Sequence, residues 1–288
     1  MSGKQKTGQT ILFSSFIFYR YYTKLFKFVK QSKENTYEKI HSATVSILWG
    51  QESYERGKFT SPNTSDTLLY RYLTPKNMKS GKKYPLVIFL HGSGERGNDN
   101  EAQLFHGEQM FLNPVYREKY PAYVIFPQCP AGVSGAYHKP LETLRPDGMP
   151  EDPPIAPIMQ TLKELIDSYI ALPSVDSRRV YIMGISMGGM ATFDMVCRFP
   201  NTFAAAIPIC GSVNPKRLAS AKEVSFRLFH GDADKAVTTE GSREAYKALR
   251  AIGADVEYIE FPGVTHGSWN PAFTRPDFMK WLFSQKKR

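Results

Sequence analysis

The stretch that most constrains this chain is residues 180–189, VYIMGISMGG. Its apolar first half is typical of a buried strand, and Gly184, Ser186 and Gly188 form a G-x-S-x-G pattern. A strand that turns at once into a helix strains the serine backbone and leaves no room for side chains two residues before and after it. It also places Ser186 at a helix N-terminus, where free N–H groups can hold negative charge. The pattern predicts a reactive serine whose hydroxyl is pushed out above the sheet, and the alternative is an ordinary glycine-rich turn.

The net charge of +10 is concentrated at the two ends of the chain. Residues 1–40 carry a charge of +6 and the last three residues carry +3, which leaves about +1 for the body between them. An enzyme that binds nucleic acid is expected to carry its basic charge on the folded domain. We therefore predict that nucleic acid is not a partner.

The first 33 residues differ from the rest and are interpreted as a separate leader or membrane-surface segment. An apolar run at 11–19 follows two lysines, and it is too short to span a membrane. Beyond it, Arg20, Lys24 and Lys27 share one helical face, a pattern suited to an anionic membrane surface. Residues 11–30 thus allow weak membrane contact, and the alternative is a leader that adds nothing to the fold.

Residues 34–288 are predicted to form a single catalytic domain around a mostly parallel sheet. Residues 37–75 alternate polar and apolar side chains, which predicts antiparallel strands at one edge of the sheet. After residue 84, apolar runs alternate with helical patterns, which indicates a parallel sheet with helices on both faces. The expected strands are 86–90, 123–126, 180–185, 204–209, 226–229 and 256–261, and the expected helices are 155–170, 190–198 and 239–252.

Residues 131–154 interrupt this alternation and are rich in glycine and proline. So long a loop is usually functional, and we predict an insertion near the active site. The strands before Cys129 and Cys210 should lie three steps apart, or roughly 14 Å. That distance is too long for a disulfide, so all three cysteines are predicted to be free thiols.

A serine hydroxyl needs a base beside it, and the base needs an orienting carboxylate. His266 follows the last strand pattern and is the last histidine of the chain. Asp232 and Asp234 both follow the strand pattern at 226–229. We favour Asp234, because Asp232 is well placed to bond backbone N–H groups of its own turn. The predicted triad is Ser186, Asp234 and His266.

The loop after the strand at 86–90 reads HGSGERG and is predicted to stabilise an oxyanion. Met187 N–H and Ser93 N–H are the expected donors, with Gly94 N–H as the second choice after Ser93, and Gly94 is expected to lie against the substrate. A phosphate loop is the alternative, but the Gly-Lys-Ser/Thr ending is missing. Glu95 and Arg96 are interpreted equally as an ion pair or as exposed charges. His91 and His230 are interpreted as structural residues.

The chain from about residue 69 to its end resembles α/β-hydrolase esterases described as predicted peptidases, close to prolyl-oligopeptidase-like and feruloyl-esterase-like enzymes. The resemblance implies the α/β-hydrolase fold and a Ser–Asp–His hydrolase. Where the group usually has a tryptophan, this chain has Tyr137-His138. The motifs that carry the resemblance are PLVIFLHGSGERG at 85–97, PQCP at 127–130, GISMGG at 184–189, FAAAIPICG at 203–211 and HGDAD at 230–234.

The predicted reaction is hydrolysis of a carboxylic ester through an acyl-enzyme on Ser186, without a cofactor or metal. Trp269 and Tyr137 are predicted to line the substrate pocket. The resemblance implies a small-molecule or carbohydrate-linked ester, such as the feruloyl or acetyl esters of plant polysaccharides. It also implies export, although the leader lacks a clean signal, which leaves a cytoplasmic or membrane-associated protein open. A serine peptidase and a non-catalytic binding protein are the alternatives.

Overall fold

The computed structural model describes residues 54–133, 135 and 151–287. All of them belong to one structural unit, residues 52–288. The predicted leader at 1–33, the membrane contact at 11–30, Tyr137 and most of the predicted insertion lie outside the described residues. Within the described part of the chain, no helix is long and apolar enough to cross a membrane.

An eight-stranded sheet with the order β1-β2-β4-β3-β5-β6-β7-β8 forms the centre of the molecule. β1 and β2 pair antiparallel, β2 also pairs antiparallel with β4, and the strands from β4 to β8 are parallel. This arrangement confirms the predicted α/β-hydrolase fold with antiparallel N-terminal edge strands. The strands are β1 (Glu55–Thr60), β2 (Thr67–Leu73), β3 (Tyr84–Leu90), β4 (Tyr123–Gln128), β5 (Val175–Ile185), β6 (Ala205–Ile209), β7 (Ser225–Gly231) and β8 (Val256–Phe261).

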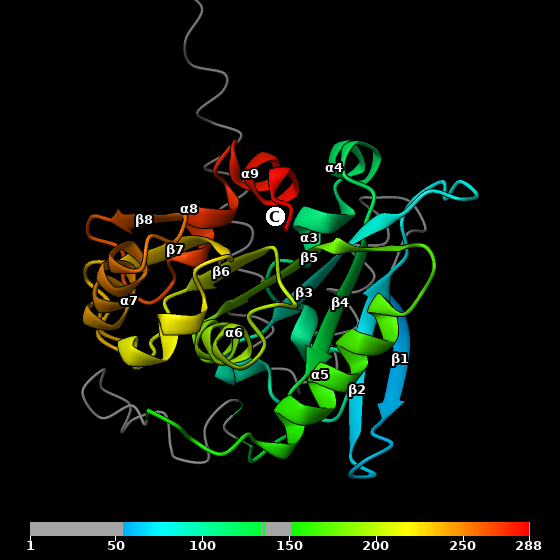
Figure 1. The fold of residues 1–288 in the computed structure, drawn as a ribbon, viewed down its shortest axis with the longest axis horizontal. Helices are drawn as coiled ribbons and strands as arrows, with labels where there is room; N and C mark the ends of the chain where they lie inside the picture. The colour runs from blue at the N-terminus through cyan, green and yellow to red at the C-terminus, as the bar shows by residue number, and fades with distance from the viewer. Residues whose placement is uncertain (1–53, 134, 136–150, 288) are drawn as a thin grey trace, which may run out of the picture. The chain divides into compact units, whose positions relative to one another are not determined.

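The three long helices, α5, α6 and α7, lie on one face of the sheet (Figure 1). Ile88 and Leu90 of β3 point to that face and join a core shared with α5 and α6. Phe89, between them in sequence, stacks on Phe126 of β4 and contacts Phe273 of α8. Both faces of the sheet are thus buried, as the continuous apolar runs predict. The helices are α3 (Glu108–Leu112), α4 (Pro114–Lys119), α5 (Pro157–Ile170), α6 (Met187–Arg198), α7 (Glu240–Ala251), α8 (Trp269–Phe273) and α9 (Phe278–Ser284).

The sheet order also confirms the predicted placement of the cysteines. β4, which precedes Cys129, and β6, which precedes Cys210, are separated by β3 and β5. All three cysteines are free. The helix after the serine starts three residues earlier than predicted, because α6 begins directly after Ser186.

Candidate active site

Ser186 lies in the tight turn between β5 and α6, in a strained backbone conformation with φ of 53° and ψ of −116°. A Cβ atom on Gly184 would come within 2.4 Å of the carbonyl oxygen of Gly188. A Cβ on Gly188 would come within 2.0 Å of the carbonyl oxygen of Leu90. These close approaches explain why the G-x-S-x-G pattern needs glycine on both sides of the serine. The strain holds the serine at the carboxyl end of a central strand, where ligands of α/β sheets bind.

The structure brings the three predicted triad residues into one hydrogen-bonded row. His266 Nε2 lies 2.9 Å from Ser186 Oγ, and His266 Nδ1 lies 2.7 Å from Asp234 Oδ2. The three residues come from loops after β5, β7 and β8, so the sheet assembles them from distant parts of the sequence. This geometry suits His266 to take a proton from the serine hydroxyl while Asp234 fixes its tautomer.

Asp234 is buried, and four N–H groups surround its carboxylate. Oδ1 accepts from the backbone N–H groups of Ala236 and Val237, and Oδ2 accepts from His266 and from His230 Nε2 at 3.2 Å. Burial alone would raise the pKa of Asp234, but the hydrogen bonds from His230, His266 and Val237 hold it well below its ordinary value. Asp234 is therefore ionised throughout the physiological pH range.

The prediction that Asp232 bonds the backbone N–H groups of its own turn is wrong. Asp234 is the residue that accepts N–H groups of its own turn, through Oδ1. Asp232 Oδ1 accepts from Gly263 N–H in the loop after β8, at 2.6 Å. Because a carboxylate has two oxygens, Asp234 serves its own turn with one and His266 with the other.

The sequence interpretation missed the part that His230 plays in the site. His230 is fully buried, as expected for a packed strand-end residue. Its Nε2 lies 2.9 Å from the carbonyl oxygen of Val237 and 3.2 Å from Asp234 Oδ2, and its Nδ1 lies 2.8 Å from Ser242 Oγ. Asp234 therefore lies between two imidazoles. The HGDAD motif places His230 four residues before Asp234, but sequence spacing does not show that the turn brings them together.

The two expected oxyanion donors lie at the starts of two helices. Met187 is the first residue of α6, and Ser93 is the first residue of the 3-10 helix η1 (Ser93–Glu95). The first N–H groups of a helix have no acceptor within it, so both are available to a ligand. Gly94 is exposed, and a Cβ placed on it would meet nothing within 4 Å. Gly94, which is predicted to lie against the substrate, therefore faces open space.

His91 anchors this loop. Its Nε2 accepts the backbone N–H of Cys129 at 2.9 Å, and its Nδ1 donates to the carbonyl oxygen of Gly92 at 2.6 Å. Burial lowers the pKa of His91 to about 4, so the ring is neutral at physiological pH. The structural interpretation of His91 agrees with these contacts, which join the ends of β3 and β4.

Glu95 and Arg96 form neither of the two arrangements expected from the sequence. Arg96 donates from Nε to the carbonyl oxygen of Ser93 and from Nη1 to that of Val133, at 2.9 and 3.0 Å. Glu95 is partly buried, and burial raises its pKa. Arg96 thus holds the loop through backbone carbonyls, because its planar guanidinium can reach two of them at once.

Trp269 lies beside the catalytic row, and its place in the substrate pocket stays a prediction. Its ring is 5.5 Å from that of His266 and 5.1 Å from that of His106. His106 Nε2 lies 3.9 Å from a carboxylate oxygen of Glu95. The sequence interpretation gave no role to His106, because nothing in its flanking residues indicates this contact.

Within the described residues, one group of side chains has the donor types and spacing for a metal ion. Ligand atoms of Cys210, Asp234 and His266 lie within 4.8 Å of one another. Burial raises the pKa of Cys210 to about 12, so its thiol is protonated and a poor ligand at neutral pH. Asp234 and His266 bond each other, so the arrangement fits proton transfer better than metal binding.

The fold and this row of side chains define the class of the molecule, which is a hydrolase of the α/β-hydrolase fold. Comparison with known proteins gives its relatives. The family model of phospholipases and carboxylesterases matches residues 77–275, which is more than half of the chain. The chain therefore belongs to the phospholipase/carboxylesterase family, and it is a carboxylesterase-type α/β hydrolase.

Individual relatives agree with this assignment. A probable carboxylesterase from Arabidopsis thaliana described as SOBER1-like is 27% identical over 201 residues, which cover 64% of this chain and 73% of the relative. The crystal structure of a thermostable esterase is 35% identical with a TM-score of 0.73, and the match covers 81% of this chain and 63% of that chain. A ferulic acid esterase is 18% identical with a TM-score of 0.61, covering 80% of this chain and 99% of that one, and shows the shared fold.

Proposed function

We propose that Ser186, His266 and Asp234 are the catalytic triad of a serine carboxylesterase that cleaves small-molecule esters. The observation that carries this proposal is the position of His266, whose two ring nitrogens bond Ser186 Oγ and Asp234 Oδ2 at 2.9 and 2.7 Å. That bridge makes the imidazole a base for the serine on one side and fixes its tautomer on the other.

In the proposed mechanism, Ser186 Oγ attacks the ester carbonyl and its proton passes to His266 Nε2. Met187 N–H and Ser93 N–H hold the oxyanion of the tetrahedral intermediate. The intermediate collapses as His266 gives the proton to the departing alcohol, which leaves an acyl group on Ser186. Water then attacks this acyl-enzyme with His266 as base, and the carboxylic acid is released. Asp234 stays ionised and stabilises the imidazolium in both steps.

For the substrate, we propose that feruloyl and acetyl esters of plant polysaccharides are within the range of this site. Support comes from the sequence resemblance and from the shared fold of the ferulic acid esterase. Peptide hydrolysis is the second candidate. Acylaminoacyl peptidases share the fold at 18% identity, which supports no more than a common scaffold.

The test is turnover of p-nitrophenyl acetate by the wild type and by Ser186→Ala. We expect wild-type turnover and a loss of about 10⁴-fold to 10⁶-fold in kcat for the variant. A wild type without activity on any ester, or a variant with full activity, would overturn the proposal. Parallel assays on methyl ferulate, acetylated xylan and a dipeptide amide then rank the substrate classes, and a preference for the amide would favour the peptidase.

A further inference from the structure

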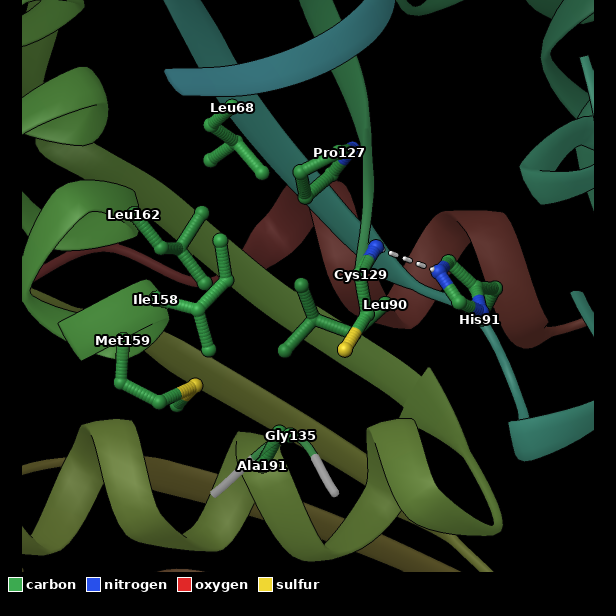
Figure 2. Close-up of a pocket in the computed structure, with 10 residues that line it drawn as sticks. All are labelled: Leu68, Leu90, His91, Pro127, Cys129, Gly135, Ile158, Met159, Leu162 and Ala191. Carbon is green, nitrogen blue, oxygen red and sulfur yellow. Dashed lines mark hydrogen bonds between the residues drawn. The ribbon is translucent and has the colours of Figure 1, made fainter. Parts of the chain in front are cut away.

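The pocket beside His91 is too small to hold a group of the substrate (Figure 2). Its volume is about 40 Å³, which has room for a few water molecules. Its wall is mostly carbon and comes from β2, β3, β4, α5, α6 and the loop after β4. A different feature, at the other end of the same strands, has the properties of a binding surface.

Basic residues gather at the amino ends of β3 and β5. Residues 74–85, which lead into β3, contain four lysines and no acidic residue. Exposed cations of this region come from the loop before β3, the start of β5 and the end of the chain. They are Lys79, Lys82, Lys83, Arg178 and Lys286, and we call these five residues the basic edge.

Hydrogen bonds join the three segments that carry the basic edge. Arg179 Nη2 donates to the carbonyl oxygen of Lys83 at 3.2 Å, which ties the start of β5 to the loop before β3. Arg178 Nη2 donates to the carbonyl oxygen of Lys287 at 2.8 Å, and the backbone N–H of Lys287 donates to the carbonyl oxygen of Arg178 at 2.9 Å. The loop before β3, the loop before β5 and α9 lie along the upper side of the sheet in Figure 1. The basic edge is therefore one continuous surface.

The charge of the basic edge is not neutralised by neighbouring carboxylates. Asp176 is the acidic residue of these segments, and it already accepts from Arg179 Nε at 2.7 Å and from the backbone N–H of Arg178 at 3.0 Å. Within the described part of the chain, no side chain of the basic edge forms a salt bridge. Since residues 41–285 carry about +1 in total, the positive charge is a local surplus.

Two exposed apolar side chains accompany these cations. Met78 and Leu172 are 46% and 40% exposed, and they are two of the four large apolar side chains that are exposed in the described residues. The Tyr123 hydroxyl lies 3.7 Å from Met78 Sδ and 2.7 Å from Ser174 Oγ, so the loops that carry Met78 and Leu172 meet there. An anionic membrane surface satisfies both kinds of side chain, because its headgroups attract cations and its acyl boundary takes up carbon. A soluble polyanion would satisfy the cations alone.

The basic edge and the catalytic serine lie at opposite ends of β5. Arg178 precedes Ser186 by eight residues, which corresponds to roughly 26 Å along a strand. A membrane that contacts the basic edge therefore leaves the carboxyl end of the sheet open to water.

We propose that the basic edge, together with Met78 and Leu172, docks on an anionic lipid surface and holds the active site toward the solvent. This contact is separate from the one predicted at residues 11–30, and it does not depend on the proposed hydrolysis at Ser186. The docked protein meets esters that arrive from solution, and not the lipids of the surface that holds it.

The test measures co-sedimentation of the full chain with vesicles of phosphatidylcholine, with and without an equal part of phosphatidylglycerol. We expect binding to the anionic vesicles alone, and weaker binding as the salt concentration rises. One cation near such a surface strengthens binding about fivefold. Lys79→Glu, Lys82→Glu and Lys83→Glu together should therefore weaken binding by at least about 100-fold. Met78→Ser with Leu172→Ser should weaken it by about tenfold.

A matched control changes the net charge equally on another surface. Lys222, Lys247 and Arg250 are exposed residues beside β7 and on α7, away from the basic edge. Their joint replacement by Glu should leave vesicle binding within about threefold of the wild type, because salt screens distant charges. Turnover of p-nitrophenyl acetate serves as the control for folding and should be unchanged in every variant. Turnover by the vesicle-bound wild type should also equal that of the free protein, since Ser186 faces away from the lipid.

Each contrary outcome has a defined meaning. A wild type that ignores anionic vesicles, or a charge-reversed basic edge that binds like the wild type, would overturn the proposal. An equal loss in the control variant would show a general effect of net charge and would also overturn it. Unchanged binding in Met78→Ser with Leu172→Ser, or tighter binding to polygalacturonate than to vesicles, would assign the surface to a soluble polyanion instead. Failure of ester hydrolysis would overturn the proposed function and leave the vesicle result standing.

Discussion

The two sides of Ser186 contrast in their chemistry. On the side of β7 and β8, Asp234 is ionised and bonds two imidazoles and two backbone N–H groups. On the side of β3 and β4, His91 is neutral, and the neighbouring pocket is lined mostly by carbon. The first side is built to hold charge while a proton moves, and the second is built to exclude charge.

The contrast shows how one strand can separate two tasks. Residues that stabilise an imidazolium must keep a negative charge close to it. That charge would cost free energy if it faced an apolar site, because it would lose its hydration there. Placing β5 between the two sides lets the carboxylate act on His266 without facing the pocket. Substitutions on the β7–β8 side should therefore change the rate of hydrolysis, and those on the other side should change the stability of the loops.

The largest effect is expected from Asp234→Asn. The amide cannot hold the tautomer of His266, so kcat should fall by about 10⁴-fold for esters of every chain length. The matched control is Asp232→Asn in the same loop, whose side chain bonds Gly263 N–H. That variant should lose less than about tenfold. A larger loss for Asp232→Asn would exchange the roles of the two aspartates.

On the β3–β4 side, His91 is expected to make the stability of the folded protein depend on pH. Its pKa of about 4 in the folded protein lies below the value of about 6.5 expected when unfolded. Between these values the unfolded state binds more protons, so stability falls as the pH falls. Because of His91, we expect the free energy of unfolding to fall by about 2 kcal/mol between pH 8 and pH 5. Urea unfolding at a series of pH values measures this change. His91→Gln should flatten this slope, and an unchanged slope would show that His91 does not cause it.

A smaller effect is expected from His230, a positioning residue for Asp234. His230→Phe removes one N–H donor from the carboxylate, and kcat should fall about tenfold with KM unchanged. Without that donor the pKa of Asp234 rises, but the donors from His266, Ala236 and Val237 keep the carboxylate ionised, so the loss should be the same from pH 8 to pH 5.

The conservative variant separates this role from packing. His230→Gln can keep a side-chain N–H near Asp234 and should recover part of the rate. Ser242→Ala removes the partner of the other ring nitrogen and should cost less than His230→Phe. A loss in His230→Gln as large as that in His230→Phe would mean that His230 supports the fold and does not act through Asp234.

Most of the sheet could be predicted from the sequence, because parallel strands that are buried on both faces read as continuous apolar runs. The order of the loops after the strands also predicted that Ser186, Asp234 and His266 meet. Contacts made by side chains across a turn could not be predicted, such as those of His230 with Asp234 and of Arg96 with backbone carbonyls. The pocket could not be predicted either, because its wall combines residues from β2, β4 and α5 that are distant in sequence.

The most direct test of this division measures kcat and the free energy of unfolding from pH 8 to pH 5 for the wild type, Asp234→Asn and His91→Gln. Asp234→Asn should lower kcat by about 10⁴-fold. His91→Gln should flatten the fall in the free energy of unfolding between pH 8 and pH 5. Full activity in Asp234→Asn, or an unchanged pH slope in His91→Gln, would contradict the division between a charged side and a neutral side of β5.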